Sequence, residues 1–102
     1  MAQTMLNILY INLSDRKDRK RHVNEQLASI GWTGERFDAI KVKNGRVGCS
    51  LSHLQCLLLA KERNWKYVFI CEDDITFTNP ELFKEQTEKF FNSDKGNKEN
   101  ND

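Results

Sequence analysis

The order of short apolar segments along the chain restricts its fold more than any other sequence feature. Two apolar runs rich in strand-forming residues, 6–13 and 67–71, and a weaker one at 36–40 are typical of β-strands. Each is followed by a segment in which apolar residues recur at helical spacing, at about 15–30, 49–64 and from 79 onward. This alternation predicts an α/β fold, a three-layer structure with a mostly parallel sheet and right-handed crossovers.

Local signals predict where the three helices begin and end. The residues that can cap their N-termini are Ser14 or Asp15 for the first helix, Ser50 or Ser52 for the second, and Asn79 before Pro80 for the third. Gly31 can end the first helix in the left-handed conformation, and residues 41–48 read as a loop. Leucines cover most of the second helix, so we expect it to be packed on more than one side.

Length and composition argue against several functional classes. The 102 residues include 16 Lys and Arg and 15 Asp and Glu, and a formal charge of +1 argues against binding to nucleic acid or anionic membranes. We see neither a membrane-spanning apolar stretch nor a signal peptide, and the three cysteines suit free thiols, so we expect a cytoplasmic location. We also expect one small domain at 1–92 and a disordered polar tail at 93–102, where no apolar residue occurs.

The acidic triplet Glu72-Asp73-Asp74 directly follows the strongest strand signal. Clustered carboxylates suit a hard divalent ion such as Mg²⁺ or Mn²⁺, which prefers oxygen ligands. In an extended segment Glu72 and Asp74 point the same way, so these two are the candidate metal ligands and Asp73 is free for a hydrogen bond elsewhere. The alternative is a solvated acidic strand end.

Two further segments follow predicted strand ends or begin a predicted helix. The basic residues from Arg16 to Arg21 start the first helix, where they can bind phosphate, and Asn12 beside them can bind a base or ribose. His53 lies in the first predicted turn of the second helix and is a possible phosphate or hydroxyl contact. Each residue also has a structural interpretation, as part of a solvated helix face or as a partly buried histidine. We see no partner base that would make Cys49 a nucleophile.

Taken in order, four segments resemble glycosyltransferase family 25. Tyr10-Ile-Asn-Leu13 with Arg16, Asp18 and Arg19 is similar to the family's opening "INL-x-x-R-x-D-R" pattern. The other three similar segments are Arg36-Phe-Asp-Ala-Ile40, Val47-Gly-Cys-Ser-Leu-Ser-His53 and Phe69-Ile-Cys-Glu-Asp-Asp74. The family includes lipooligosaccharide and procollagen galactosyltransferases.

The resemblance implies a GT-A-like fold that transfers a hexose, commonly galactose, from a nucleotide diphosphate sugar to a glycan or protein hydroxyl. It implies that Glu72 and Asp74 hold a divalent metal, Mn²⁺ or else Mg²⁺. It also implies that the donor sugar nucleotide is bound by Asn12, Arg16, Arg19, His53 and Asp73.

The family's members are much longer, and nothing after Phe77 resembles their later segment. We therefore expect a truncated form of the fold, the donor-binding half, with an unidentified catalytic base and an open side that an oligomer or a partner covers. The alternative is a non-catalytic nucleotide-sugar-binding or assembly module. A phosphoacceptor receiver domain is disfavoured because it needs an acidic pair after the first strand and a lysine after a fifth strand.

Overall fold

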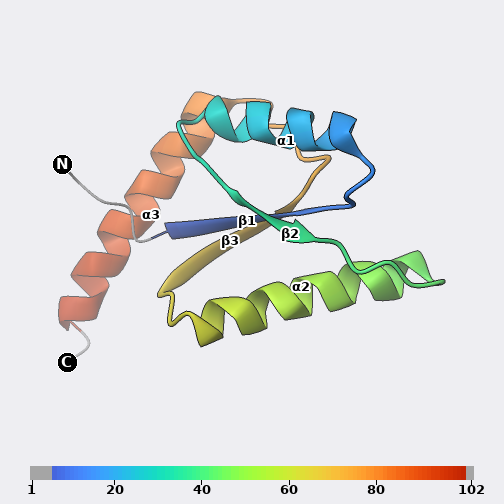
Figure 1. Ribbon diagram of the computed structural model, residues 1–102. Coiled ribbons are helices and arrows are strands. Elements are labelled where there is room, and N and C mark those ends of the chain that lie inside the picture. The colour runs from blue at the N-terminus through green and yellow to red at the C-terminus, as the bar shows by residue number, and fades with distance from the viewer. Residues whose placement is uncertain (1–5, 101–102) are drawn as a thin grey trace.

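Within residues 6–100 the chain folds as six alternating strands and helices, in the predicted order (Figure 1). A computed structural model describes the backbone of residues 6–100 and the side chains of residues 6–93. The elements are β1 (Leu6–Asn12), α1 (Lys17–Ala28), β2 (Glu35–Asp38), α2 (Gly45–Glu62), β3 (Tyr67–Glu72) and α3 (Pro80–Asn100). The predicted α/β class is confirmed.

The three strands form one parallel sheet in the order β2-β1-β3, with β1 in the centre. Asn12 at the end of β1 pairs in register with Asp38 of β2, and Ile11 pairs with Glu72 of β3. All three strands therefore end at the same edge of the sheet, and the segments that leave them begin side by side.

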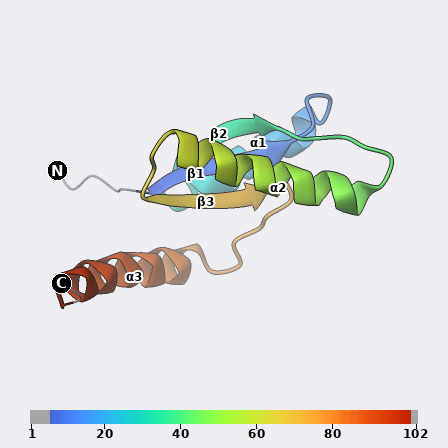
Figure 2. The same cartoon turned by 90° about the horizontal axis from the view of Figure 1, so that it is seen from below.

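The helices cover both faces of this sheet, which gives the predicted three layers (Figure 2). Alternate residues of β1 point to opposite sides, because side chains alternate along a strand. Ile8 and Tyr10 pack with Val23 and Leu27 of α1, whereas Leu9 and Ile11 pack on the α2 face, with residues that include Cys56, Leu59 and Trp65. Helix α3 meets the α1 face through Phe83, whose ring contacts Trp32, Phe69 and Phe77.

Helix α1 begins without the predicted side-chain cap. Its N-cap residue is Arg16, and no side chain there accepts a hydrogen bond, so the prediction of Ser14 or Asp15 was wrong. The chain turns instead through a backbone hydrogen bond of 2.9 Å from the amide of Arg16 to the carbonyl of Leu13. At the other end Gly31 adopts the predicted left-handed conformation, with φ of 75°.

Helix α2 begins at Gly45, four residues before the predicted start, and is capped by Asn44 rather than Ser50 or Ser52. The side-chain oxygen of Asn44 accepts hydrogen bonds from the amides of Arg46 and Val47. Gly48 therefore lies within the helix, and a Cβ there would come within 2.6 Å of the Ile40 carbonyl oxygen. The missing side chain lets α2 cross close to the segment that follows β2.

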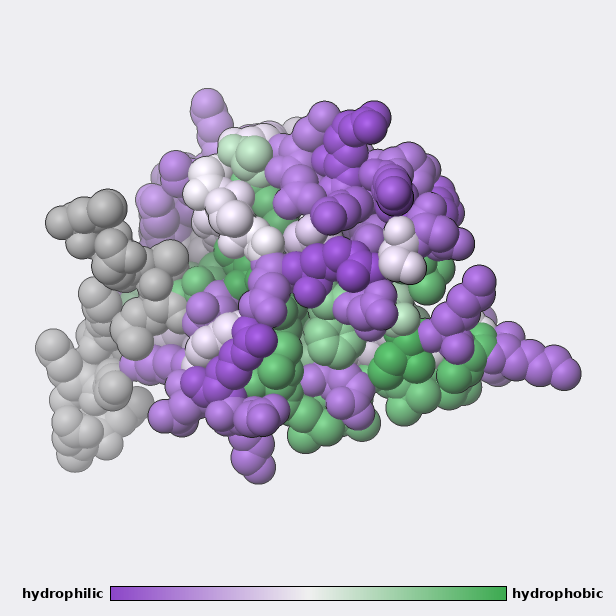
Figure 3. Space-filling view, in the orientation of Figure 1, coloured by the Kyte–Doolittle hydropathy of each residue, from purple (hydrophilic) through white to green (hydrophobic). Residues whose placement is uncertain are grey.

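One face of α2 is exposed, contrary to our expectation of packing on more than one side. Leu54, Leu57 and Leu58 are 49%, 52% and 48% exposed. Only the helix face that includes Ser52, Cys56 and Ala60 is buried. Hydrophobic residues accordingly reach the surface along the lower part of the molecule in Figure 3, where α2 lies in Figure 1. Helical periodicity alone could not separate a second buried face from an exposed apolar one.

Helix α3 begins as predicted, with the Asn79 side chain accepting a hydrogen bond of 3.1 Å from the amide of Leu82. It continues to Asn100, through most of the polar segment for which the sequence predicts disorder. Side chains from residue 94 onward and residues 101–102 lie outside the described part of the chain, so the boundary at residue 92 stays a prediction. Within residues 6–100, no helix is both long and apolar enough to cross a bilayer.

Candidate binding pocket at the carboxyl edge of the sheet

A pocket of about 350 Å³ opens where the three strands end. It is lined by the segments that follow β1 and β2, by the end of β3 and by the first turns of α2. Its charged residues are Arg16, Arg19, Lys41, Lys43, Glu72 and Asp73, and its apolar wall includes Ile11, Ala39, Ile40 and Val42. Parallel α/β sheets bind ligands at this edge, because the strand-to-helix loops gather there.

Asn12 lies under this pocket and joins the ends of the strands. It is only 1% exposed. Its amide nitrogen donates to a carboxylate oxygen of Asp73 at 2.9 Å and to the backbone carbonyl of Arg16 at 3.1 Å, and its oxygen accepts from Arg36 at 2.9 Å. Both amide protons and the oxygen have partners within the protein, so the Asn12 side chain positions the strand ends beneath the pocket. A contact between Asn12 and the donor stays a prediction.

Arg36 is a member of this network that sequence reasoning missed. Besides the Asn12 side chain, its guanidinium donates to the Asn12 backbone carbonyl and to Asp38, both at 2.8 Å. It thereby links β2 to β1 at the pocket edge. Its one signal in the sequence is its place in the segment 36–40, which resembles the family and predicts a weak strand.

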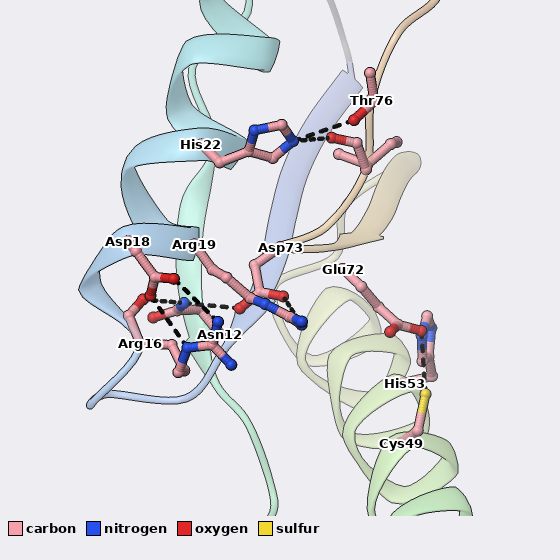
Figure 4. A network of polar contacts seen from close by, with 11 residues as sticks. Asn12, Arg16, Asp18, Arg19, His22, Cys49, His53, Glu72, Asp73 and Thr76 are labelled. Atoms are coloured by element: carbon pink, nitrogen blue, oxygen red, sulfur yellow. Dashed lines mark hydrogen bonds and ion pairs between the residues drawn. The ribbon is translucent and has the colours of Figure 1, made fainter.

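Glu72 and Asp73 of the acidic triplet point to different surroundings (Figure 4). Asp73 is nearly buried and lies between Asn12 and Arg19, whose guanidinium is 3.5 Å from the carboxylate. Glu72 points instead toward α2, as the alternation along an extended segment predicts. Asp74 is exposed, is not among the residues that line the pocket, and has no side-chain partner among the described residues.

Arg16 reaches the pocket from the N-terminus of α1, where it also holds a neighbouring carboxylate. Its guanidinium donates twice to Asp18, at 3.0 and 3.1 Å. These hydrogen bonds, together with one from the backbone at Arg19, lower the pKa of Asp18 to about 2. Arg16 is therefore held at the pocket edge by Asp18, whose lowered pKa keeps its carboxylate ionised.

Glu72 meets two side chains of α2 at the opposite wall of the pocket. One of its carboxylate oxygens accepts a hydrogen bond from the thiol of Cys49 at 3.1 Å and lies 3.3 Å from Nε2 of His53 (Figure 4). The thiol hydrogen bond is the main cause that lowers the pKa of Glu72 and raises that of Cys49. His53 and Glu72 are both predicted site residues, but their contact with each other and with Cys49 has no signal in the sequence.

Further along, His22 of α1 fixes the segment between β3 and α3. Its Nε2 lies 2.8 Å from the carbonyl oxygen of Ile75 and therefore donates a hydrogen bond to it. This contact holds the chain that leaves the acidic triplet against α1. No local pattern in the sequence indicates this contact, because it joins residues 53 positions apart.

Parallel α/β domains bind their ligands at this edge of the sheet, and four of the six charged residues that line the pocket are cationic. The family described as "Glycosyltransferase family 25 (LPS biosynthesis protein)" matches residues 41–101, more than half of the chain. The chain therefore belongs to glycosyltransferase family 25, and the resemblance seen in the sequence is confirmed.

A Haemophilus influenzae protein, described as a candidate glycosyltransferase, is 31% identical over 87 aligned residues. The match covers 64% of this chain and 31% of that relative, so the chain spans about a third of its length. No solved structure matches the chain. The GT-A-like fold stays a prediction.

Proposed function

We propose that this chain binds the nucleotide diphosphate sugar donor of a hexosyltransferase, with galactose as the expected sugar. The observation that carries the proposal is the pocket at the carboxyl edge, which combines four cationic side chains with an apolar wall. Its volume of about 350 Å³ lies at the lower end of the range for small-molecule sites, roughly 300–1,000 Å³. Membership of glycosyltransferase family 25 supports the same class of reaction.

The charge distribution suits a donor of this kind. Arg16 and Arg19 approach the pocket from α1, and Lys41 and Lys43 approach from the segment between β2 and α2. In hexosyl transfer the bond between the anomeric carbon and the diphosphate oxygen breaks, and negative charge grows on the departing diphosphate. Cations fixed around that position stabilise the developing charge. The acceptor is a glycan or protein hydroxyl, and we assign no catalytic base among the described residues.

The predicted divalent ion fits the described residues only in part. Mn²⁺ and Mg²⁺ prefer several oxygen ligands, and Glu72 offers one carboxylate at the pocket wall. Asp74, the second predicted ligand, is exposed outside the residues that line the pocket. A metal bound through Glu72 and Asp74 stays part of the proposal, and it would neutralise the diphosphate.

Calorimetric titration of the 102-residue chain with uridine diphosphate and its galactose conjugate, with and without Mn²⁺, tests the proposal. Lys43→Gln, which removes an exposed pocket cation, should weaken binding about two- to fivefold, as expected for one solvent-exposed ion pair of about 0.4–1 kcal/mol. Lys17→Gln is the matched control, because Lys17 is exposed and does not line the pocket. Absence of binding at millimolar nucleotide, or equal loss in both variants, would contradict donor binding.

A second candidate function, an assembly module, is favoured by the exposed leucines of α2. Such a module would bury this face against a partner or another copy of the chain. Light scattering separates the two candidates: a strictly monomeric chain that binds nucleotide supports the donor-binding function. Self-association that Leu57→Gln abolishes, without any response to nucleotide, supports assembly.

A further inference from the structure

Three different metal-binding side chains converge at the wall of the pocket formed by α2 and β3 (Figure 4). They are the thiol of Cys49, the imidazole of His53 and the carboxylate of Glu72, and one ligand atom from each lies within 4.8 Å of the others. Cys49 and His53 are four residues apart on α2, so they stand one turn apart on the same helix face. Glu72, the last residue of β3, meets them from the sheet.

Two of the three distances within this cluster are close to those of a tetrahedral metal site. The Glu72 oxygen is 3.1 Å from the Cys49 sulfur and 3.3 Å from Nε2 of His53. In tetrahedral zinc sites, bonds of about 2.0–2.3 Å place neighbouring ligand atoms about 3.3–3.6 Å apart. The third distance, from the Cys49 sulfur to the His53 ring nitrogen, is within 4.8 Å. An ion at the centre therefore requires side-chain movements of up to about 1 Å, with the thiol proton released as the metal binds.

The chemical nature of the three groups selects the ion. One sulfur, one nitrogen and one oxygen suit a borderline-soft ion, whereas Mn²⁺ and Mg²⁺ favour oxygen ligands alone. We propose that Cys49, His53 and Glu72 bind one zinc-class divalent ion. Three protein ligands leave a fourth tetrahedral position, and two of the three ligands, Cys49 and Glu72, line the pocket.

This site differs from the Mn²⁺ or Mg²⁺ site that the sequence predicts. Both use Glu72, but the zinc-class site needs Cys49 and His53 and does not need Asp74. The fourth position would accept water or an anionic oxygen of a ligand in the pocket, and the ion would add a positive charge to that wall. The inference goes beyond the proposed function and does not depend on it, because the cluster exists whatever the pocket binds.

Titration of the reduced chain with Co²⁺, without nucleotide, tests the site directly. A thiolate bound to Co²⁺ gives near-ultraviolet charge-transfer absorption, and tetrahedral Co²⁺ gives intense visible bands. We expect both at one equivalent, and we expect Zn²⁺ to remove them by displacement. Cys49→Ser and His53→Gln should each weaken Zn²⁺ binding at least about a hundredfold, because even groups that only orient a metal ligand contribute ten- to a hundredfold.

Asp74→Asn is the control variant and should leave the Co²⁺ spectrum unchanged. Cys49 is exposed, so its serine variant should keep the wild-type far-ultraviolet circular dichroism, which shows that lost binding is not lost folding. The proposal is overturned if no charge-transfer band forms, if the band survives Cys49→Ser, or if Asp74→Asn abolishes it. Failure to bind uridine diphosphate, with the Co²⁺ spectrum intact, would refute the donor-binding function alone.

Discussion

Replacing Asn12 by alanine should destabilise the chain by about 3 kcal/mol, because this side chain joins three strand ends beneath the pocket. The change removes hydrogen bonds to Asp73, to the Arg16 carbonyl and from Arg36. The loss at Asp73 weighs most, since that carboxylate is only 8% exposed and its remaining charged partner, Arg19, is 3.5 Å away.

The magnitude follows from the three contacts. A hydrogen bond to a charged group that is left unsatisfied contributes about 1.5–3 kcal/mol, and the neutral bond to the Arg16 carbonyl about 0.5–1.5 kcal/mol. Arg36 adds little, because it keeps its bonds to the Asn12 backbone and to Asp38 and is partly exposed to water. The sum is about 2–4.5 kcal/mol, and a loss of about 3 kcal/mol lowers Tm by roughly 12–24 °C in a domain of this size.

Urea unfolding followed by tryptophan fluorescence measures the change. Asn24→Ala is the control, since Asn24 is exposed and its loss should destabilise by no more than about 1 kcal/mol. In an Asp73→Ala background, Asn12→Ala should lower the free energy of unfolding by about 1.5–3 kcal/mol less, because there is no Asp73 carboxylate to lose its hydrogen-bond partner. If the free energy of unfolding of Asn12→Ala is within about 0.5 kcal/mol of the wild-type value, Asn12 does not hold the strand ends together.

Three further changes test the packing. Gly48→Ala should destabilise the fold by about 1–3 kcal/mol, although alanine has the better helix propensity, because its Cβ would lie 2.6 Å from a backbone oxygen. Gly45→Ala is the control: Gly45 has open space around it, so this change should leave the melting temperature unchanged. Burial raises the pKa of Cys56 to about 11 and of Cys71 to about 12, so the folded chain keeps protons that the unfolded chain loses above pH 9. Stability should therefore fall by about 2 kcal/mol for each thiol between pH 9 and 11, and replacing both by alanine should flatten urea-unfolding profiles across that window. Leu57→Gln should change the free energy of unfolding by no more than about 0.5 kcal/mol, since Leu57 is half exposed. A larger loss would show that this face of α2 is buried.

The fold was predictable to the extent that local sequence patterns determine it. The strand-forming runs at residues 6–13 and 67–71 predict β1 and β3, and the parallel arrangement follows from the helices between the strands. The start of α2 was misplaced, because Asn44 and Gly45 favour a turn as strongly as a helix start. Its exposed face was missed, since periodicity identifies apolar faces without showing whether anything covers them.

The site was predictable as a location but not as a set of contacts. The end of β3 identified Glu72, and the rule for parallel sheets placed it beside Arg16 and Arg19. The partners of Asn12 were not readable, because they lie up to 61 residues away in sequence. Cys49 and Glu72 are 23 residues apart and lie in different motifs, so their contact was not readable from the sequence either.

Burial divides the polar and charged residues at the strand ends into two groups with different tasks. Asn12 and Asp73 are buried and already bonded to one another, so neither can turn toward a ligand without losing a protein contact. Lys41 and Lys43 are exposed, line the pocket and have no side-chain partner among the described residues, which leaves their charges available. Substitutions at the first pair should therefore lower stability and binding together, whereas substitutions at the two lysines should lower binding alone. The lysines, which no motif singled out, are the sharper test of what the pocket holds.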